Sequence, residues 1–220
     1  GVDEMTPKLP KPYYEQDGIV IFNADCREIL PHLPKVDLVL TDPPYGIGAD
    51  KGTTGFGCAE GKKYFDSWDV KPESLDSVLF AGKKAIIFGG NYFTDLLPMN
   101  GHWIVWDKIG EMKFQNPFSD CELAWTNFDK KSVKKYVCIQ QGFVAKEKTR
   151  FHPTQKTVML FANIIGDYSN IVDTILDPFM GSGTTLVAAK QLGRKAIGIE
   201  IEEKYCEIAV KRLGQGVLAL

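Results

Sequence analysis

The sequence predicts an α/β fold with a doubly wound, mainly parallel sheet. Short β-branched segments, such as 36–41 and 195–200, alternate along the chain with segments whose apolar residues have helical spacing, such as 155–168. Two motifs rich in glycine or proline, at 42–45 and 178–183, directly follow predicted strands. Sheets of this class bind their ligands at that position.

The elements can be assigned in order along the chain. Two helical turns are stopped by Pro31 and Pro34, and the next strand must end at Pro43, because two prolines cannot continue a central strand. Residues 46–69 show no periodicity, which predicts a functional or disordered loop. Strands are expected at 18–23, 36–41, 85–88, 103–106, 121–126, 171–176 and 195–200, helices at 26–33, 72–82, 91–97, 155–168, 183–192 and 203–213, and loops or hairpins at 108–120 and 127–150.

Size and composition restrict what the protein can be. A chain of 220 residues is expected to form one domain, residues 1–220. The net charge of -2 excludes binding of nucleic acid by bulk charge alone, so any such contact needs a local basic patch. None of the five cysteines has metal-site spacing, and no apolar run could span a bilayer. We therefore expect a cytoplasmic protein without metal or membrane contact.

The turn at 176–185 is the first candidate for ligand binding. Gly181 and Gly183 would let the backbone pass close to a ligand, and the strand that follows ends in Glu200, where a carboxylate can accept hydrogen bonds from ribose hydroxyls. A phosphate-binding P-loop would need a lysine where Thr184 stands, and a dinucleotide site would need GxGxxG. A purely structural turn remains the third alternative.

The segment Asp42-Pro43-Pro44-Tyr45 is the second candidate and suggests chemistry on an amine. An exocyclic amine of a base is a poor nucleophile, because its lone pair is delocalised into the ring. Acceptors on both N–H bonds, here the Asp42 carboxylate and the Pro43 carbonyl, would favour the positive charge that develops in a direct displacement. Tyr45 offers a ring face for stacking. The chain has no Pro-Cys pair for attack on a ring carbon, and the alternative is a plain turn capped by aspartate.

Together these motifs resemble those of the DNA amino-methyltransferases. Asp42 to Tyr45 resembles the catalytic motif, and Phe179-x-Gly181-x-Gly183 the S-adenosylmethionine motif, in the circularly permuted order of the beta group. Segments 23–30 and 152–156 also resemble family motifs, although Thr157 stands where proline is frequent. The resemblance implies S-adenosylmethionine as cofactor, a methyltransferase-type sheet, catalytic residues Asp42, Pro43, Pro44 and Tyr45, and cofactor-binding residues Asp25, Cys26, Asp42, Asp177, Phe179, Gly181, Ser182, Gly183, Thr184, Thr185, Glu200 and Ile201.

The same resemblance implies that double-stranded DNA is the substrate and that the target base is flipped out of it. Residues 108–150 are the candidate for a small target-recognition insertion. The basic residues expected to contact phosphates lie in or next to it, although a solvated lysine-rich hairpin would look the same. They are Lys130, Lys131, Lys134, Lys135, Lys146, Lys148 and Arg150.

Several functions stay open at this stage. Adenine N6 is favoured over cytosine N4, because serine is commoner than aspartate at the position of Asp42 in the family's cytosine enzymes. RNA or a protein glutamine amide are alternative substrates. A cofactor-binding module without its own activity is the third class. The small recognition region favours a second subunit, either a copy of this chain or a partner.

Overall fold

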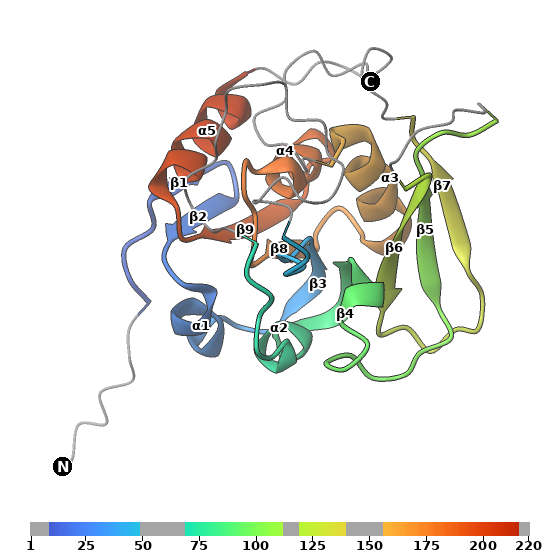
Figure 1. Ribbon diagram of the computed structural model, residues 1–220. Helices are drawn as coiled ribbons and strands as arrows, with labels where there is room; N and C mark the ends of the chain where they lie inside the picture. Colours follow the sequence, from blue (N-terminus) through green and yellow to red (C-terminus); the bar gives the residue numbers. More distant parts are fainter. Residues whose placement is uncertain (1–8, 49–68, 112–118, 140–155, 216–220) are drawn as a thin grey trace. The chain divides into compact units, whose positions relative to one another are not determined.

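The computed structural model describes residues 9–48, 69–111, 119–139 and 156–215 (Figure 1). Strands and helices alternate along these ranges, so the predicted α/β class is confirmed. The chain divides into two compact units, one formed by residues 1–41, 76–86 and 147–220, the other by 42–75 and 87–146. Within the described residues, no helix has the length and apolar character needed to cross a membrane.

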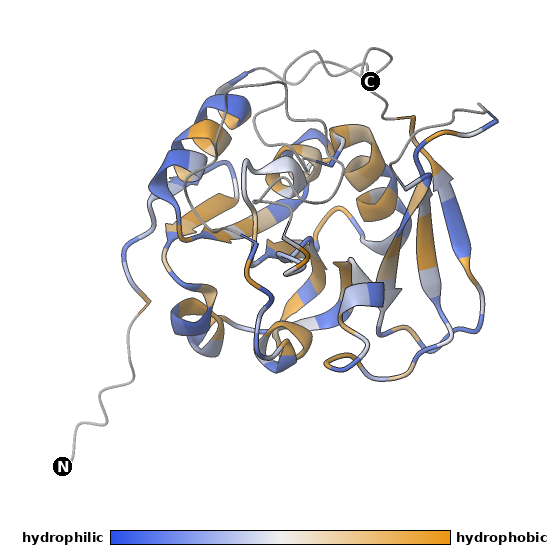
Figure 2. Cartoon of the chain, in the orientation of Figure 1, coloured by the Kyte–Doolittle hydropathy of each residue, from blue (hydrophilic) through white to orange (hydrophobic). Residues whose placement is uncertain are grey.

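The first unit contains the parallel part of the sheet. Its strand order is β1-β2-β9-β8-β3-β4, with β2–β9, β9–β8 and β8–β3 parallel and β1 antiparallel at the edge. Central strands carry nearly continuous apolar runs because both faces are covered. In Figure 2 these runs are the orange segments on β3 and β9. The bounds are β1 (Tyr14–Gln16), β2 (Ile19–Asn23), β3 (Val36–Thr41), β4 (Gly82–Phe88), β8 (Thr174–Asp177) and β9 (Lys195–Glu200).

Helices cover both faces of these strands. In Figure 1, α3, α4 and α5 lie on one side, with α3 packed on α4 and α4 on α5, and α1 and α2 lie on the other. The hydroxyl of Thr157 accepts a hydrogen bond from the backbone N–H of Leu160 at 3.2 Å, which caps α3. The bounds are α1 (Cys26–Ile29), η1 (Leu30–His32), α2 (Asp76–Ala81), α3 (Val158–Tyr168), α4 (Thr184–Gln191) and α5 (Glu203–Gly214).

The second unit is built on strands β5 (Trp103–Asp107), β6 (Cys121–Thr126) and β7 (Lys134–Val137). β5 pairs antiparallel with β6 and parallel with β7, and the 3-10 turn η3 (Gly90–Tyr92) follows the end of β4. Trp106 is buried in this unit, and its indole N–H donates to the carbonyl of Cys138 at 2.8 Å. Buried tryptophans thus supply both the core and the hydrogen bonds that fix its loops.

Several predicted elements were wrong in detail, among them the helix 72–82, which runs only from Asp76 to Ala81. The segment 91–97 forms the end of the turn η3 and a second hydrogen-bonded turn, and no α-helix, because Phe93, at φ -118° and ψ 23°, leaves helical geometry between them. The exposed strand β7 lies where loops or hairpins were predicted, since its lysines hide the usual alternation. β8 begins at Thr174, three residues late, because Asn170 donates its backbone N–H to the Asp173 carboxylate in a turn.

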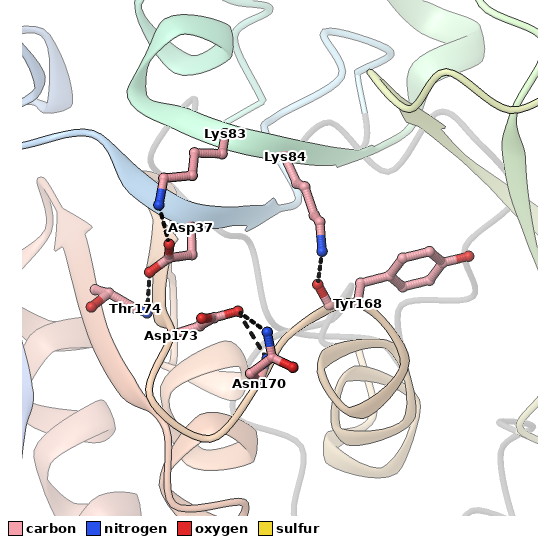
Figure 3. Close-up of polar contacts among 7 residues, drawn as sticks. All are labelled: Asp37, Lys83, Lys84, Tyr168, Asn170, Asp173 and Thr174. Atoms are coloured by element: carbon pink, nitrogen blue, oxygen red, sulfur yellow. Dashed lines mark hydrogen bonds and ion pairs between the residues drawn. The ribbon is translucent and has the colours of Figure 1, made fainter.

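The amino ends of the central strands are tied together by charged groups, shown in Figure 3. The carboxylate of Asp37 on β3 accepts from Lys83 Nζ on β4 at 2.8 Å and from the backbone N–H of Thr174 on β8 at 3.0 Å. The hydrogen bond from Lys83, followed by that from Thr174, lowers the pKa of Asp37. One carboxylate therefore aligns the starts of three strands.

We expect Asp37→Ala to lower the free energy of unfolding by about 1 kcal/mol, the worth of one hydrogen bond to a backbone donor. Urea denaturation measures this loss. Because the folded pKa is lowered, the stabilisation is present above the unfolded value, about 4, and disappears as the pH falls through the folded pKa. A difference between variant and wild type that persisted after Asp37 is protonated would contradict the electrostatic explanation.

Candidate active site

The turn between β8 and α4 has a shape that requires glycine. Gly181 and Gly183 adopt φ 49° and 79°, in the left-handed region. A Cβ at Gly183 would lie 2.7 Å from Cβ of Ala209 on α5, so the helix is packed directly on the turn. At Gly181 an added Cβ would meet no atom of the described residues within 4 Å. One side of the turn is thus closed by α5, and Gly181 borders open space.

Glu200 at the end of β9 holds this turn from another direction. Its Oε2 accepts from the backbone N–H of Gly181 at 3.0 Å, and its Oε1 accepts from the backbone N–H of Glu202 at 2.8 Å. Burial raises the pKa of Glu200, against the lowering effect of these two bonds. The structure therefore brings together the glycine turn and the acidic strand end that the sequence singled out separately.

Asp177, predicted to bind the cofactor, has partners inside the protein and is 3% exposed. Its Oδ1 accepts from the hydroxyl of Thr41 at 2.7 Å and from the backbone N–H of Phe179 at 3.1 Å. Its Oδ2 accepts from the hydroxyl of Thr185 at 2.5 Å. Asp177 thus joins the end of β3, the turn after β8 and the first turn of α4. Its role in this structure is to hold the turn.

The predicted adenine-side segment lies beside Glu200. The side-chain amide of Asn23 donates to the carbonyls of Glu200 at 3.0 Å and Ile201 at 2.9 Å, which joins the ends of β2 and β9. Asp25 caps α1 by accepting from the backbone N–H of Arg27, and the guanidinium of Arg27 lowers its pKa. Ile201 is 65% exposed and presents apolar surface next to this end of the sheet.

Cys26, also predicted to contact the cofactor, is half-buried. Burial raises the pKa of its thiol to about 11, so the side chain is neutral at physiological pH. A neutral thiol behaves as a small apolar group, which suits packing beside a flat base better than ionic chemistry.

The second unit contains the motif Asp42 to Tyr45. The hydroxyl of Tyr45 donates to Oδ1 of Asp42 at 2.5 Å. The Tyr45 ring stacks on Tyr92, with centroids 5.0 Å apart and planes 25° apart, and meets the edge of Phe93 at 6.0 Å. A Cβ at Gly89 would lie 2.1 Å from the ring, so only glycine fits there. The ring is held in one place, and its hydroxyl fixes the rotation of the carboxylate.

The pKa of Tyr45 agrees with its hydroxyl acting as the donor in this hydrogen bond. Burial first, and then the negative charge of Asp42, raise it well above 10. The hydroxyl therefore keeps its proton at neutral pH and acts as a donor. Beyond the motif, the backbone N–H of Gly46 donates to the carboxylate of Asp69 at 2.7 Å, which brings the two ends of the predicted loop 46–69 together.

The basic residues divide into those that the structure describes and those that it does not. Lys130 and Lys131 precede β7, and Lys134 and Lys135 lie on it; all four are exposed. Lys135 pairs with Asp107 at 3.3 Å, an exposed contact of little energetic worth. Lys146, Lys148 and Arg150, the motif at 152–155 and residues 49–68 lie outside the described residues.

Comparison with known proteins identifies the family. A family model described as DNA methylase matches residues 57–211. The chain belongs to the DNA methylase family. It is 32% identical over 213 residues to the type II methyltransferase M.HpaI of Haemophilus parainfluenzae, covering 81% of this chain and 68% of that protein. It is 29% identical to M2.LlaDCHI of Lactococcus lactis subsp. cremoris, covering 94% of each.

Solved structures agree with this assignment. The methylase superposes on the M1.HpyAVI–SAM complex with a TM-score of 0.55 and 27% identity, covering 89% of this chain and 99% of that chain. It shares its fold with the cytosine-N4-specific PvuII DNA methyltransferase, with a TM-score of 0.64 at 15% identity, covering 95% and 91%. The predicted family and fold are confirmed. Proteins of this family use S-adenosylmethionine as the methyl donor.

The turn of the methylase fits that donor. Open space at Gly181 leaves room for a ligand, the Glu200 carboxylate can accept hydrogen bonds from hydroxyls, and exposed Ile201 suits a flat base. No group of three or more histidine, cysteine or acidic side chains in the described part of the chain is placed to hold a metal.

Sequence reasoning missed residues whose contacts are distant along the chain. The hydrogen-bond partner of Thr41 lies 136 residues away, and that of Asn23 lies 177 residues away. The partners of Arg212 in the turn lie 28–30 residues away. Tyr92, which stacks on Tyr45, could have been suspected from its position just after the glycine pair 89–90 at a strand end.

We expect Gly183→Ala to destabilise the methylase more than Gly193→Ala does. Both glycines have positive φ, but an added Cβ meets Ala209 at position 183 and, among the residues that the structure describes, nothing within 4 Å at position 193. The control should lose about 1 kcal/mol, the cost of the backbone conformation, and Gly183→Ala about 1–3 kcal/mol more, the cost of overpacking. Chemical denaturation compares the two, and equal losses would show that α5 does not close the turn.

Proposed function

We propose that this methylase transfers a methyl group from S-adenosylmethionine to N6 of an adenine flipped out of double-stranded DNA, at a specific site. The observation that carries this proposal is the carboxylate of Asp42, fixed by the hydroxyl of Tyr45 in an Asp-Pro-Pro-Tyr motif. The relatives named as type II methyltransferases support a site-specific reaction of the restriction–modification kind.

The fixed carboxylate suits the chemistry of an exocyclic amine. Asp42 accepts one N–H of the amine and the carbonyl of Pro43 accepts the other, which weakens delocalisation of the lone pair. When bound, S-adenosylmethionine supplies an electrophilic methyl group on a positive sulfonium. As the amine gains positive charge, the negative charge of Asp42 stabilises it without having to reorient, because Tyr45 already holds the carboxylate.

The first unit supplies the residues for the donor. In our proposal Glu200 accepts hydrogen bonds from the ribose hydroxyls, and Gly181 lets the methionine part pass close to the backbone. Asp25, Cys26 and Ile201 surround the adenine. The buried Asp177, Ser182, Thr184 and Thr185 keep the turn in shape.

DNA contact is assigned to the basic residues on and around β7. Lys130, Lys131, Lys134 and Lys135 are exposed, as phosphate contacts require. Lys146, Lys148 and Arg150 complete the proposed set. Phosphate contacts position the duplex, and their binding free energy offsets part of the few kcal/mol that unstacking a base costs.

Cytosine N4 is the alternative target. It is also an exocyclic amine, so the same carboxylate would serve it, and the cytosine-N4-specific PvuII enzyme has the same fold. Asp42 supports adenine, by resemblance to the family's adenine enzymes. A second subunit, a copy or a partner, would add to the recognition that the small segment 108–150 provides.

The product of the reaction decides between the two bases. Purified protein, labelled S-adenosylmethionine and unmethylated genomic DNA should yield N6-methyladenine on nucleoside analysis. Sequencing of the same DNA should show methylation confined to one short site. N4-methylcytosine would overturn our choice of base and keep the mechanism. No label in DNA, alone or with candidate partner subunits, would refute the proposed reaction.

Asp42→Ala should abolish transfer, with kcat reduced by a factor of about 10³ or more. It should leave the dissociation constant of S-adenosylmethionine nearly unchanged. Tyr45→Phe is the matched variant, because it keeps the ring stacked on Tyr92 and removes only the hydroxyl. Its kcat should fall about tenfold, since the carboxylate loses its fixed rotation. Wild-type turnover in Asp42→Ala would refute the catalytic assignment, and wild-type turnover in Tyr45→Phe would refute the orienting hydrogen bond.

A further inference from the structure

Arg212 on α5 is a buried arginine whose guanidinium reaches the glycine turn. The residue is 8% exposed. Nη1 donates to the carbonyl of Ser182 at 2.7 Å, to the hydroxyl of Ser182 at 3.0 Å and to the hydroxyl of Thr184 at 3.2 Å. Burying a guanidinium is costly unless its donors are satisfied, so these bonds set the position of the side chain.

The position of this charge argues against a role in helix stability alone. Thr184 is the first residue of α4, and a cation at a helix N-terminus opposes the helix dipole. An apolar side chain of similar size would fill the same space without this penalty. The arginine instead fixes a backbone carbonyl in the middle of the turn, which an apolar side chain cannot do.

The turn is thus held from two sides. Glu200 on β9 binds the N–H of Gly181, and Arg212 on α5 binds the carbonyl of the next residue, Ser182. Ala209, three residues before Arg212 on the same face of α5, packs against Gly183. Opposite charges on two different elements therefore set the orientation of the peptide groups on either side of the 181–182 peptide, those of 180–181 and 182–183.

We infer that Arg212 is a positioning residue for the cofactor: it holds the 181–183 backbone in the orientation in which the open side of Gly181 faces the ligand. This inference rests on the proposed binding of S-adenosylmethionine at this turn. Arg212 acts through the turn and makes no contact with the reacting atoms. It should therefore change cofactor affinity and leave DNA affinity unaffected.

The test compares Arg212→Met, which keeps most of the side-chain length and removes the donors, with Arg212→Lys, which keeps the charge and one donor group. Arg194→Lys is the matched control, because the guanidinium of Arg194 donates to Ser169 and to the Leu192 carbonyl and, within the described part of the chain, to no residue of the turn. Calorimetric titration with S-adenosylmethionine is done on the full chain, well below each variant's melting temperature, and KM for DNA is measured in parallel.

We expect Arg212→Met to raise the dissociation constant of S-adenosylmethionine about tenfold or more, with KM for DNA unchanged. Arg212→Lys should have an intermediate dissociation constant, and Arg194→Lys should bind like the wild type.

A variant that melts earlier but binds the cofactor with wild-type affinity would overturn the inference and leave only a structural role. If Arg212→Met does not fold, Arg212→Lys decides: wild-type affinity in that variant, with its single donor group, would overturn the inference. A wild-type protein that binds no S-adenosylmethionine would refute the proposed function itself, before any variant is compared.

Discussion

The buried carboxylate of Asp177 is the interaction on which the rest of the cofactor site depends. It accepts hydrogen bonds from Thr41 at the end of β3, from Phe179 in the turn and from Thr185 in α4. A buried carboxylate without donors would cost several kcal/mol, so these three elements are held at one set of positions. Thr41 is the last residue of β3, so its hydrogen bond fixes the end of that strand beside the start of the cofactor turn.

Contacts from two sides also explain why the turn itself has one defined shape. A glycine-rich segment has high conformational freedom and would lose it on ligand binding, at the expense of affinity. Here Glu200 fixes one peptide N–H and α5 closes the other side at Gly183. The turn therefore loses its conformational entropy during folding, and it already has this shape when the ligand arrives. The raised pKa of Glu200 reflects the burial that comes with this arrangement.

How far the sequence predicts this protein depends on the range of the interactions involved. Strands β3 and β9 were found at the predicted residues, because strands buried on both faces have an unmistakable apolar run. β7 was missed because its exposed lysines carry no such pattern. In the site, the glycines and Glu200 are recognisable from local spacing. Thr41 and Asn23 are not, because their partners lie 136 and 177 residues away and no local pattern marks a hydrogen bond of that span.

The motif that identifies the family therefore mixes two kinds of residue. Asp177, Ser182, Thr184 and Thr185 are buried and their side chains face the interior, whereas Gly181 borders open space and Ile201 is exposed. The interior group determines the shape of the turn, and the outward group is what a ligand can touch. In the catalytic motif the same two roles are found within one pair of residues. The Tyr45 ring is fixed by Tyr92 and Gly89, and its hydroxyl orients the carboxylate of Asp42. A shared motif is thus evidence of a shared scaffold first, and specificity for one base or another has to come from the residues that face outward.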